Sequence, residues 1–251
     1  MTKTFSIGEC FSVGWEKFKQ HAWFLVGMML GVYVLMFIFT VLIEDVFYGI
    51  EPTQSVIDFV SNIVLYWLCF GMTVIVLKII DQKPYTWTDL FIADKQVVWY
   101  LVGSFLYGLM VAVGILVLVI PGLYLAIRYG FFWYAIVDGR KGVIESFKES
   151  TRITDGVKWN LVLFAFASIG VILLGVLCFG IGLLVAAPVV MLATAHLYRV
   201  LLVQSVVVPQ TMGTLPETPS RPKPVAEIPT ASSSVAAAPL PEQPNLTNSN
   251  T

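Results

Sequence analysis

VVWYLVGSFLYGLMVAVGILVLVIPGLYLAIRYGFFWYAIV, from Val97 to Val137, contains 41 residues, and Arg128 is the single charged residue among them. A helix of this length measures about 61 Å at 1.5 Å per residue, whereas one crossing of the hydrocarbon core needs only about 20 residues. The stretch is therefore long enough for two crossings. Pro121 and Gly122 are the expected helix-turn between them, because proline is tolerated in the first turn of a helix.

The composition of the whole chain agrees with a lipid environment. Hydrophobic residues make up 57% of the 251 residues and charged residues 12%, with a mean hydropathy of +0.82. Too few polar side chains remain to cover a water-soluble protein of this size, so the lipid bilayer is the expected partner. A net charge of −1 argues against nucleic acid as a partner. The three cysteines lie far apart without a CxxC pair, so no metal site and no cofactor is expected.

Further apolar runs complete an all-α, polytopic membrane fold. Each run is long enough to cross the bilayer once, and the runs are 21–43, 59–80, 159–179 and 181–203. Together with the two crossings of Val97 to Val137 they predict six transmembrane helices. The first run is too long for a cleavable signal and has no small-residue cleavage site, so it is expected to be retained.

The basic residues orient these six helices. Fourteen of the fifteen lysines and arginines fall on one side, and Arg128 is the fifteenth. The first outer loop carries Glu44, Asp45 and Glu51 and no base. Because basic loops stay in the cytoplasm, both termini are predicted to be cytoplasmic.

Three similar units are expected, at about 6–80, 86–137 and 142–205. Residues 7–11 match 143–147 at an offset of 136, and Trp99 matches Trp23 at an offset of 76. Each unit is interpreted as a short cytoplasmic amphipathic helix followed by a transmembrane hairpin. In the first unit Phe11, Trp15 and Phe18 follow one helical stripe and are the predicted interfacial anchors. The alternative is chance similarity between apolar stretches.

The chain divides by composition into a transmembrane domain, 1–207, and a tail, 208–251. Nine of the thirteen prolines lie in the tail, which has no aromatic residue and so cannot form a core. The tail is predicted to be disordered and cytoplasmic. A protein partner bound through this tail and a plain solvated extension both remain open.

Arg128 is the candidate centre of a polar cluster inside the membrane. An arginine at that depth is expected to face the other helices, not lipid. Its expected neighbours are Asp58, Asn62, Tyr66, Tyr107, Ser168 and Thr194. Two interpretations stay open. Arg128 pairs with Asp58 or with free carbonyls near Pro121 and fixes the helices, or it holds the phosphate or carboxylate of an anionic lipid or small anion. His196 and Arg199, on one helical face, are predicted to contact lipid headgroups or a ligand.

Three segments carry a resemblance to a known family: FSIGECFSVGWEKFKQ at 5–20, IPGLYLAIRYGFFWYAIVDGRKG at 120–142 and GVIESFKESTRITDGVKWNL at 142–161. They resemble the membrane domain of glycerophosphoryl diester phosphodiesterases and its stand-alone bacterial relatives. The resemblance implies an integral protein of the bacterial inner membrane. In that family hydrolysis belongs to a separate soluble domain, and only the tail follows the sixth helix here, so hydrolysis is not implied.

Function is the least determined property. The sequence has no GxSxG, HExxH or phosphate-binding loop and no paired acids at helical spacing, so catalytic residues are not expected. The favoured hypothesis is a non-enzymatic bundle that supports membrane integrity or acts as a scaffold. The alternative is a small transporter or lipid-handling protein with a midplane polar site around Arg128, and an enzyme ranks third.

Overall fold

The computed structural model describes residues 5–46, 53–139, 142–178 and 180–213, all of them helical or in short connections. The described residues fall in the first of two compact units, Met1–Thr214, and the second unit, Leu215–Thr251, lies outside them. The elements are α1 (Ile7–Val46), α2 (Thr53–Ile80), the 3-10 helix η1 (Trp87–Phe91), α3 (Lys95–Val117), α4 (Val119–Tyr129), α5 (Phe132–Gly139), α6 (Val143–Thr154), α7 (Lys158–Leu177) and α8 (Leu183–Gly213). The described part of the chain is therefore all-α, as predicted.

Within the described ranges five helices are long and apolar enough to cross a membrane. They lie in α1, α2, α3, α7 and α8, with lengths of 20 to 37 residues. Many of their large apolar side chains are exposed, which fits contact with lipid tails and would be unfavourable in water. These are the helices of a membrane protein.

The helix expected from Pro121 to Val137 is not continuous. The chain forms α4, a turn at Gly130 and Phe131, and then the short helix α5. The reversal after α3 also comes earlier than expected, at Leu118, whose backbone is extended between the two helices. Pro121 thus lies in the first turn of α4. Gly122 packs closely on α3, since a Cβ there would come within 2.5 Å of the Ile115 backbone nitrogen.

Hydroxyl groups from neighbouring helices satisfy the carbonyls that this break exposes. The Tyr107 hydroxyl donates to the Ala126 carbonyl at 3.0 Å. The Ser150 hydroxyl donates to the Arg128 carbonyl at 2.9 Å, and Thr154 reaches the same carbonyl at 3.4 Å. A broken helix is stable at membrane depth only when such groups replace the lost helical hydrogen bonds. The sequence pattern of apolar residues cannot show this, because the donors come from α3 and α6.

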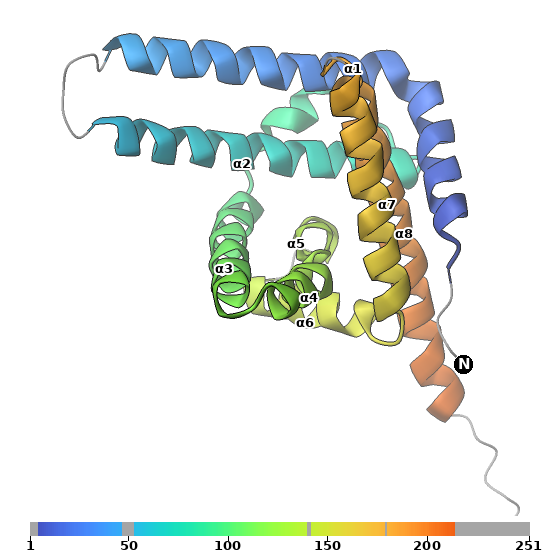
Figure 1. Ribbon diagram of the computed structural model, residues 1–251. Coiled ribbons are helices and arrows are strands. Elements are labelled where there is room, and N and C mark those ends of the chain that lie inside the picture. The colour runs from blue at the N-terminus through green and yellow to red at the C-terminus, as the bar shows by residue number, and fades with distance from the viewer. Residues whose placement is uncertain (1–4, 47–52, 140–141, 179, 214–251) are drawn as a thin grey trace, which may run out of the picture. The chain divides into compact units, whose positions relative to one another are not determined.

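Short helical segments precede the apolar part of α1 and the long helices α3 and α7. The first is the start of α1, which bends at His21 (φ −121°, ψ 19°) before the long apolar part, as Figure 1 shows. The second is η1, and the third is α6. The start of α1 packs along α8, and α7 and α8 lie side by side (Figure 1).

The helix α5 lies in the protein interior. Phe132 and Ile136 are fully buried, and they pack with Phe70 of α2 and Tyr100 of α3. Because α5 contacts α2, α3 and α6, it connects two of the long helices with the short helix α6.

Two expectations concern residues at the limits of the described ranges. The tail was expected from Val208, but α8 continues to Gly213, because the apolar run at 206–208 extends the helix. The remainder of the expected tail, and most of the expected outer loop between Glu44 and Glu51, lie outside the described residues.

Candidate functional site

One arginine binds two carboxylates where α2, α5 and α8 meet. Arg199 donates from Nε and Nη2 to the two oxygens of Asp81, at 2.8 and 2.6 Å. It donates from Nη1 and Nη2 to the two oxygens of Asp138, both at 2.7 Å. The planar guanidinium therefore forms a bidentate contact with each carboxylate. These three residues are called the Arg199 cluster below.

Two further groups complete the electrostatics of the Arg199 cluster. Lys83 lies 3.0 Å from an Asp81 oxygen, and the Tyr198 hydroxyl donates to Asp138 at 3.3 Å. Two positive and two negative charges thus balance. The side chain of Arg199 is 23% exposed, so water screens these contacts less than on an open surface.

The Arg199 cluster joins chain segments that are distant in sequence. Asp81 directly follows the last residue of α2, Asp138 is near the end of α5, and Arg199 lies in α8. The contacts with Asp81 and Asp138 span 118 and 61 residues. The arrangement holds the ends of α2 and α5 against the middle of α8.

The sequence prediction for Arg199 needs correction. Arg199 was expected, with His196, to contact lipid headgroups or a ligand, but its guanidinium is engaged by carboxylates of the protein, and His196 is partly buried on α8. A sequence signal for this cluster exists. Ile79-Ile80-Asp81 and Ile136-Val137-Asp138 both place an aspartate directly after an apolar run, which marks two carboxylates at matching helix ends.

Arg128 and Asp58 do not pair. Asp58 is exposed on α2, its backbone carbonyl accepts from Asn62, and no ion pair within the described ranges joins Asp58 to Arg128. Arg128 instead donates from Nη1 to the hydroxyl of Tyr124, one turn earlier on α4, at 3.2 Å. The helix-pairing interpretation through Asp58 is therefore corrected, because Asp58 is exposed and the Arg128 guanidinium contacts Tyr124 of its own helix.

Two further expected neighbours of Arg128 bond within their own helices. The Ser168 hydroxyl donates to the Phe164 carbonyl, and the Thr194 hydroxyl donates to the Val190 carbonyl. Both contacts follow the usual pattern of a hydroxyl bonded one turn back along its own helix.

The two tyrosines of the expected cluster lie in the aromatic core. Tyr66 stacks on Trp133 with ring centroids 6.3 Å apart. Tyr107 contacts the segment of Arg128, but through the Ala126 carbonyl and not through the guanidinium. Of the six expected neighbours, Tyr107 alone is thus seen to bond to that segment.

The expected interfacial anchors divide between protein and surface. Phe11 stacks on Phe164 of α7 with centroids 5.2 Å apart, and Phe18 is buried. Trp15 is exposed and stacks on Phe18. Two of the three side chains therefore pack against other helices, since this face of α1 lies along α8.

Three tryptophans are exposed near the starts of long apolar helices. Trp23 follows the bend of α1, Trp99 lies in the first turns of α3, and Trp159 is the second residue of α7. Trp23 and Trp159 are 93% and 81% exposed. Exposed tryptophan in this position is typical of the boundary between lipid and water.

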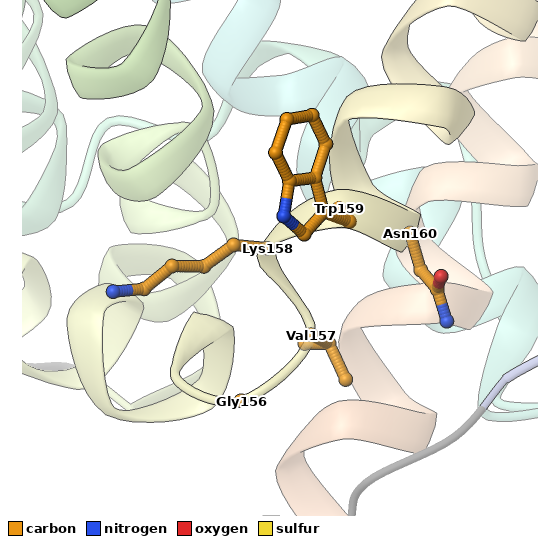
Figure 2. Close-up of a pocket in the computed structure, with 5 residues that line it drawn as sticks. All are labelled: Gly156, Val157, Lys158, Trp159 and Asn160. Atoms are coloured by element: carbon orange, nitrogen blue, oxygen red, sulfur yellow. The ribbon is translucent and has the colours of Figure 1, made fainter.

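A surface pocket of about 350 Å³ lies at the start of α7, lined by residues 156–160. Figure 2 shows Lys158 and Asn160 extending to opposite sides, with Trp159 between them. Because the pocket is open and has no buried polar group among the residues that line it, it does not have the form of a substrate site.

The described residues hold no group of three or more His, Cys, Asp or Glu side chains placed to bind a metal. The three thiols are free: Cys10 is buried, Cys69 is partly buried and Cys178 is exposed.

Comparison with protein-family models, with curated proteins and with solved structures finds no match to this chain.

Proposed function

We propose that this protein is a non-enzymatic, multi-pass bundle of the bacterial inner membrane that supports membrane integrity or acts as a scaffold. The Arg199 cluster is the observation that supports this most directly. Its charges are satisfied by one another, which suits a cluster that holds helices in place. A catalytic or transport site instead needs donors, acceptors or charges that are free to bind the substrate.

The proposed topology has six crossings with both termini in the cytoplasm. The broken pair α4 and α5 makes the fourth crossing, since residues 119–139 are together long enough to span the bilayer. The exposed tryptophans near the starts of α3 and α7 mark the cytoplasmic boundary in this arrangement.

The proposed threefold repeat has a counterpart in equivalent positions. The sequence offsets of 136 and 76 imply an offset of 60 between the second and third units. Gly114 and Gly175, both packed against the returning helix, lie 61 residues apart, one more than this offset. A closely packed glycine in each hairpin supports the proposed repeat of the second and third units.

The transporter alternative has less support. A midplane site needs polar groups that face a shared cavity. Asn62, Ser168 and Thr194 each donate to a carbonyl of their own helix. The bends in α1 and between α4 and α5 are features that transporters share, so a test by transport remains worthwhile.

The experiment that tests the proposed function is a gene deletion complemented with variants. We expect the deletion to raise the permeability of the cell envelope to a membrane-impermeant dye. The wild-type protein should restore the barrier, and Arg199→Gln should not. Lys19→Gln, at an exposed position of α1, is the matched control and should restore the barrier. Normal dye exclusion after deletion, together with a lost uptake activity, would overturn the proposal in favour of transport.

Topology is tested separately with reporters. A reporter fused after residue 208 should read cytoplasmic, and one inserted near Pro52 should read external, because the bases are so unevenly distributed. A C-terminus on the external side would exclude six crossings with a cytoplasmic N-terminus.

A further inference from the structure

Two basic side chains from different helices converge on one tyrosine. The guanidinium carbon of Arg128 lies 5.9 Å from the centre of the Tyr124 ring, and the Lys158 ammonium lies 5.5 Å from the same centre. Arg128 comes from α4 and Lys158 from the first position of α7. The ring partly offsets the repulsion of two like charges, but a π system does not neutralise them.

The protein balances the positive charge of this pair only in part. No carboxylate within the described ranges forms an ion pair with Arg128, and its Nε is buried without a hydrogen-bond partner. Lys158 has one loose partner, Asp155, at 3.8 Å, and both side chains are about half exposed. An unpaired buried donor costs about 1–3 kcal/mol, so this Nε marks a place where an acceptor is expected. Arg199, by contrast, is fully engaged.

The site is held rigidly. The Arg128 carbonyl accepts from Ser150 and Thr154, which fixes the backbone from which the guanidinium extends. A small cavity of about 20 Å³ lies between the two helices, lined by Tyr124, Ile127, Arg128, Thr154, Lys158 and Leu161 among others. That space accepts about one atom of the size of a water oxygen. It fits one oxygen of an oxyanion whose remaining atoms lie outside.

The position of the site decides which oxyanion fits. Lys158 directly precedes Trp159, whose exposed indole is typical of the boundary between lipid and water. Arg128 shares Tyr124 with Lys158, so an oxyanion bound by both bases lies beside this boundary. Ile127 and Leu161 continue the cavity as an apolar wall. The two bases fit a charged headgroup, and the apolar wall fits an acyl chain. A phospholipid has both features.

We propose that Arg128, Lys158 and Tyr124 form a binding site for the phosphate of an anionic phospholipid between α4 and α7. The guanidinium donates from Nε to one phosphate oxygen, and the Lys158 ammonium balances the remaining charge. The site shares no residue with the Arg199 cluster, so it goes beyond the proposed scaffold function and stands or fails separately.

The test is lipid binding to the purified full-length protein in detergent, followed by native mass spectrometry with phosphatidylglycerol and, as the zwitterionic comparison, phosphatidylcholine. We expect preference for phosphatidylglycerol, and expect Arg128→Gln and Lys158→Gln each to weaken it about tenfold, the loss of one charged hydrogen bond. The matched control is Lys95→Gln, which removes a base at the start of another long helix, α3, and should leave the affinity unchanged.

Other outcomes overturn the proposal. Equal weakening by Lys95→Gln would mean general attraction to basic residues, and unchanged binding in both site variants would mean no site. Inorganic phosphate is added in a second arm. If it displaces the lipid at millimolar concentration, or binds alone with the same dependence on Arg128 and Lys158, the ligand is a soluble phosphate and the lipid assignment is overturned. Should Arg128→Gln not fold, as judged by its melting temperature, the exposed Lys158→Gln decides alone.

Discussion

Arg199 of α8 and Asp138 of α5 share two hydrogen bonds of 2.7 Å across 61 residues of sequence. The same guanidinium binds Asp81 at the end of α2, so one side chain of α8 joins the ends of both α2 and α5. Its five N–H groups allow this because they lie in one plane and point in several directions. An ammonium has no such plane.

The first prediction follows from this geometry. Arg199→Gln should lower the free energy of unfolding by about 2–3 kcal/mol, since it leaves two partly buried carboxylates without their partner. Arg199→Lys should recover only part of this loss, because lysine cannot bind both carboxylates with paired contacts. Thermal unfolding in detergent, followed by tryptophan fluorescence, measures both effects.

A double-mutant cycle checks whether the loss belongs to the Arg199 cluster. Asp138→Asn combined with Arg199→Gln should cost less than the sum of the two single changes, because they remove one shared interaction. Strict additivity of the two changes would show that Asp138 and Arg199 act independently, contrary to the geometry.

The second prediction concerns acid and the 3-10 helix η1. Burial acts to raise the pKa of Asp89, but hydrogen bonds from Lys78 and the Thr86 N–H, together with the Lys78 charge, outweigh it and hold this pKa below its ordinary value. A lowered pKa in the folded state means that the contribution to stability is complete above the ordinary pKa of about 3.9 and is lost as pH falls through the lower, folded value. Wild type should therefore be more stable than Asp89→Asn at pH 7.

The difference between wild type and Asp89→Asn should shrink as the pH falls below about 4, where the carboxylate takes up a proton. Melting temperatures of both proteins between pH 7 and pH 3 measure it. A stability difference that stays constant over this range would assign the effect to shape and not to charge.

The third prediction uses a close backbone approach. A Cβ on Gly71 of α2 would lie 2.2 Å from the carbonyl oxygen of Leu90 in η1, and a backbone atom cannot move aside cheaply. Gly71→Ala should destabilise the protein by about 1–3 kcal/mol and detach η1. Faster trypsin cleavage at Lys83 reports the detachment. Gly108→Ala in α3 is the control, because nothing lies within 4 Å of its Cβ and alanine favours the helix.

The fourth prediction separates two aromatic residues of α1. Phe11→Ala should lower the melting temperature, since Phe11 stacks on Phe164 and the change leaves a gap between α1 and α7. Trp15→Ala should leave the free energy of unfolding within about 0.5 kcal/mol of wild type, because Trp15 is exposed. Comparable losses in both variants would contradict the packing described for this face of α1.

Sequence patterns predicted the helices better than the polar contacts. Long apolar runs, the reversal after α3 near Pro121 and the turn between α7 and α8 follow from length and composition, because each crossing needs about 20 apolar residues. The contacts of Arg128 were not predictable in this way. Its depth was inferred from a continuous helix, whereas the chain breaks at Gly130 and brings Arg128 next to Lys158.

What the sequence by itself determined is the all-helical class of the described residues and the apolar runs of five of the six membrane-spanning helices that it predicts. These depend on local composition and on the 1.5 Å rise of a helix, which neighbouring residues alone set. What only the tertiary structure decided is which charges meet. Arg199 finds Asp81 and Asp138, and Arg128 shares Tyr124 with Lys158, because α8, α5, α4 and α7 are brought together by packing between segments far apart in the chain. The hydroxyls of Tyr107, Ser150 and Thr154 stabilise the break between α4 and α5, because they bond to the carbonyls that it exposes. No property of the apolar run itself encodes those donors.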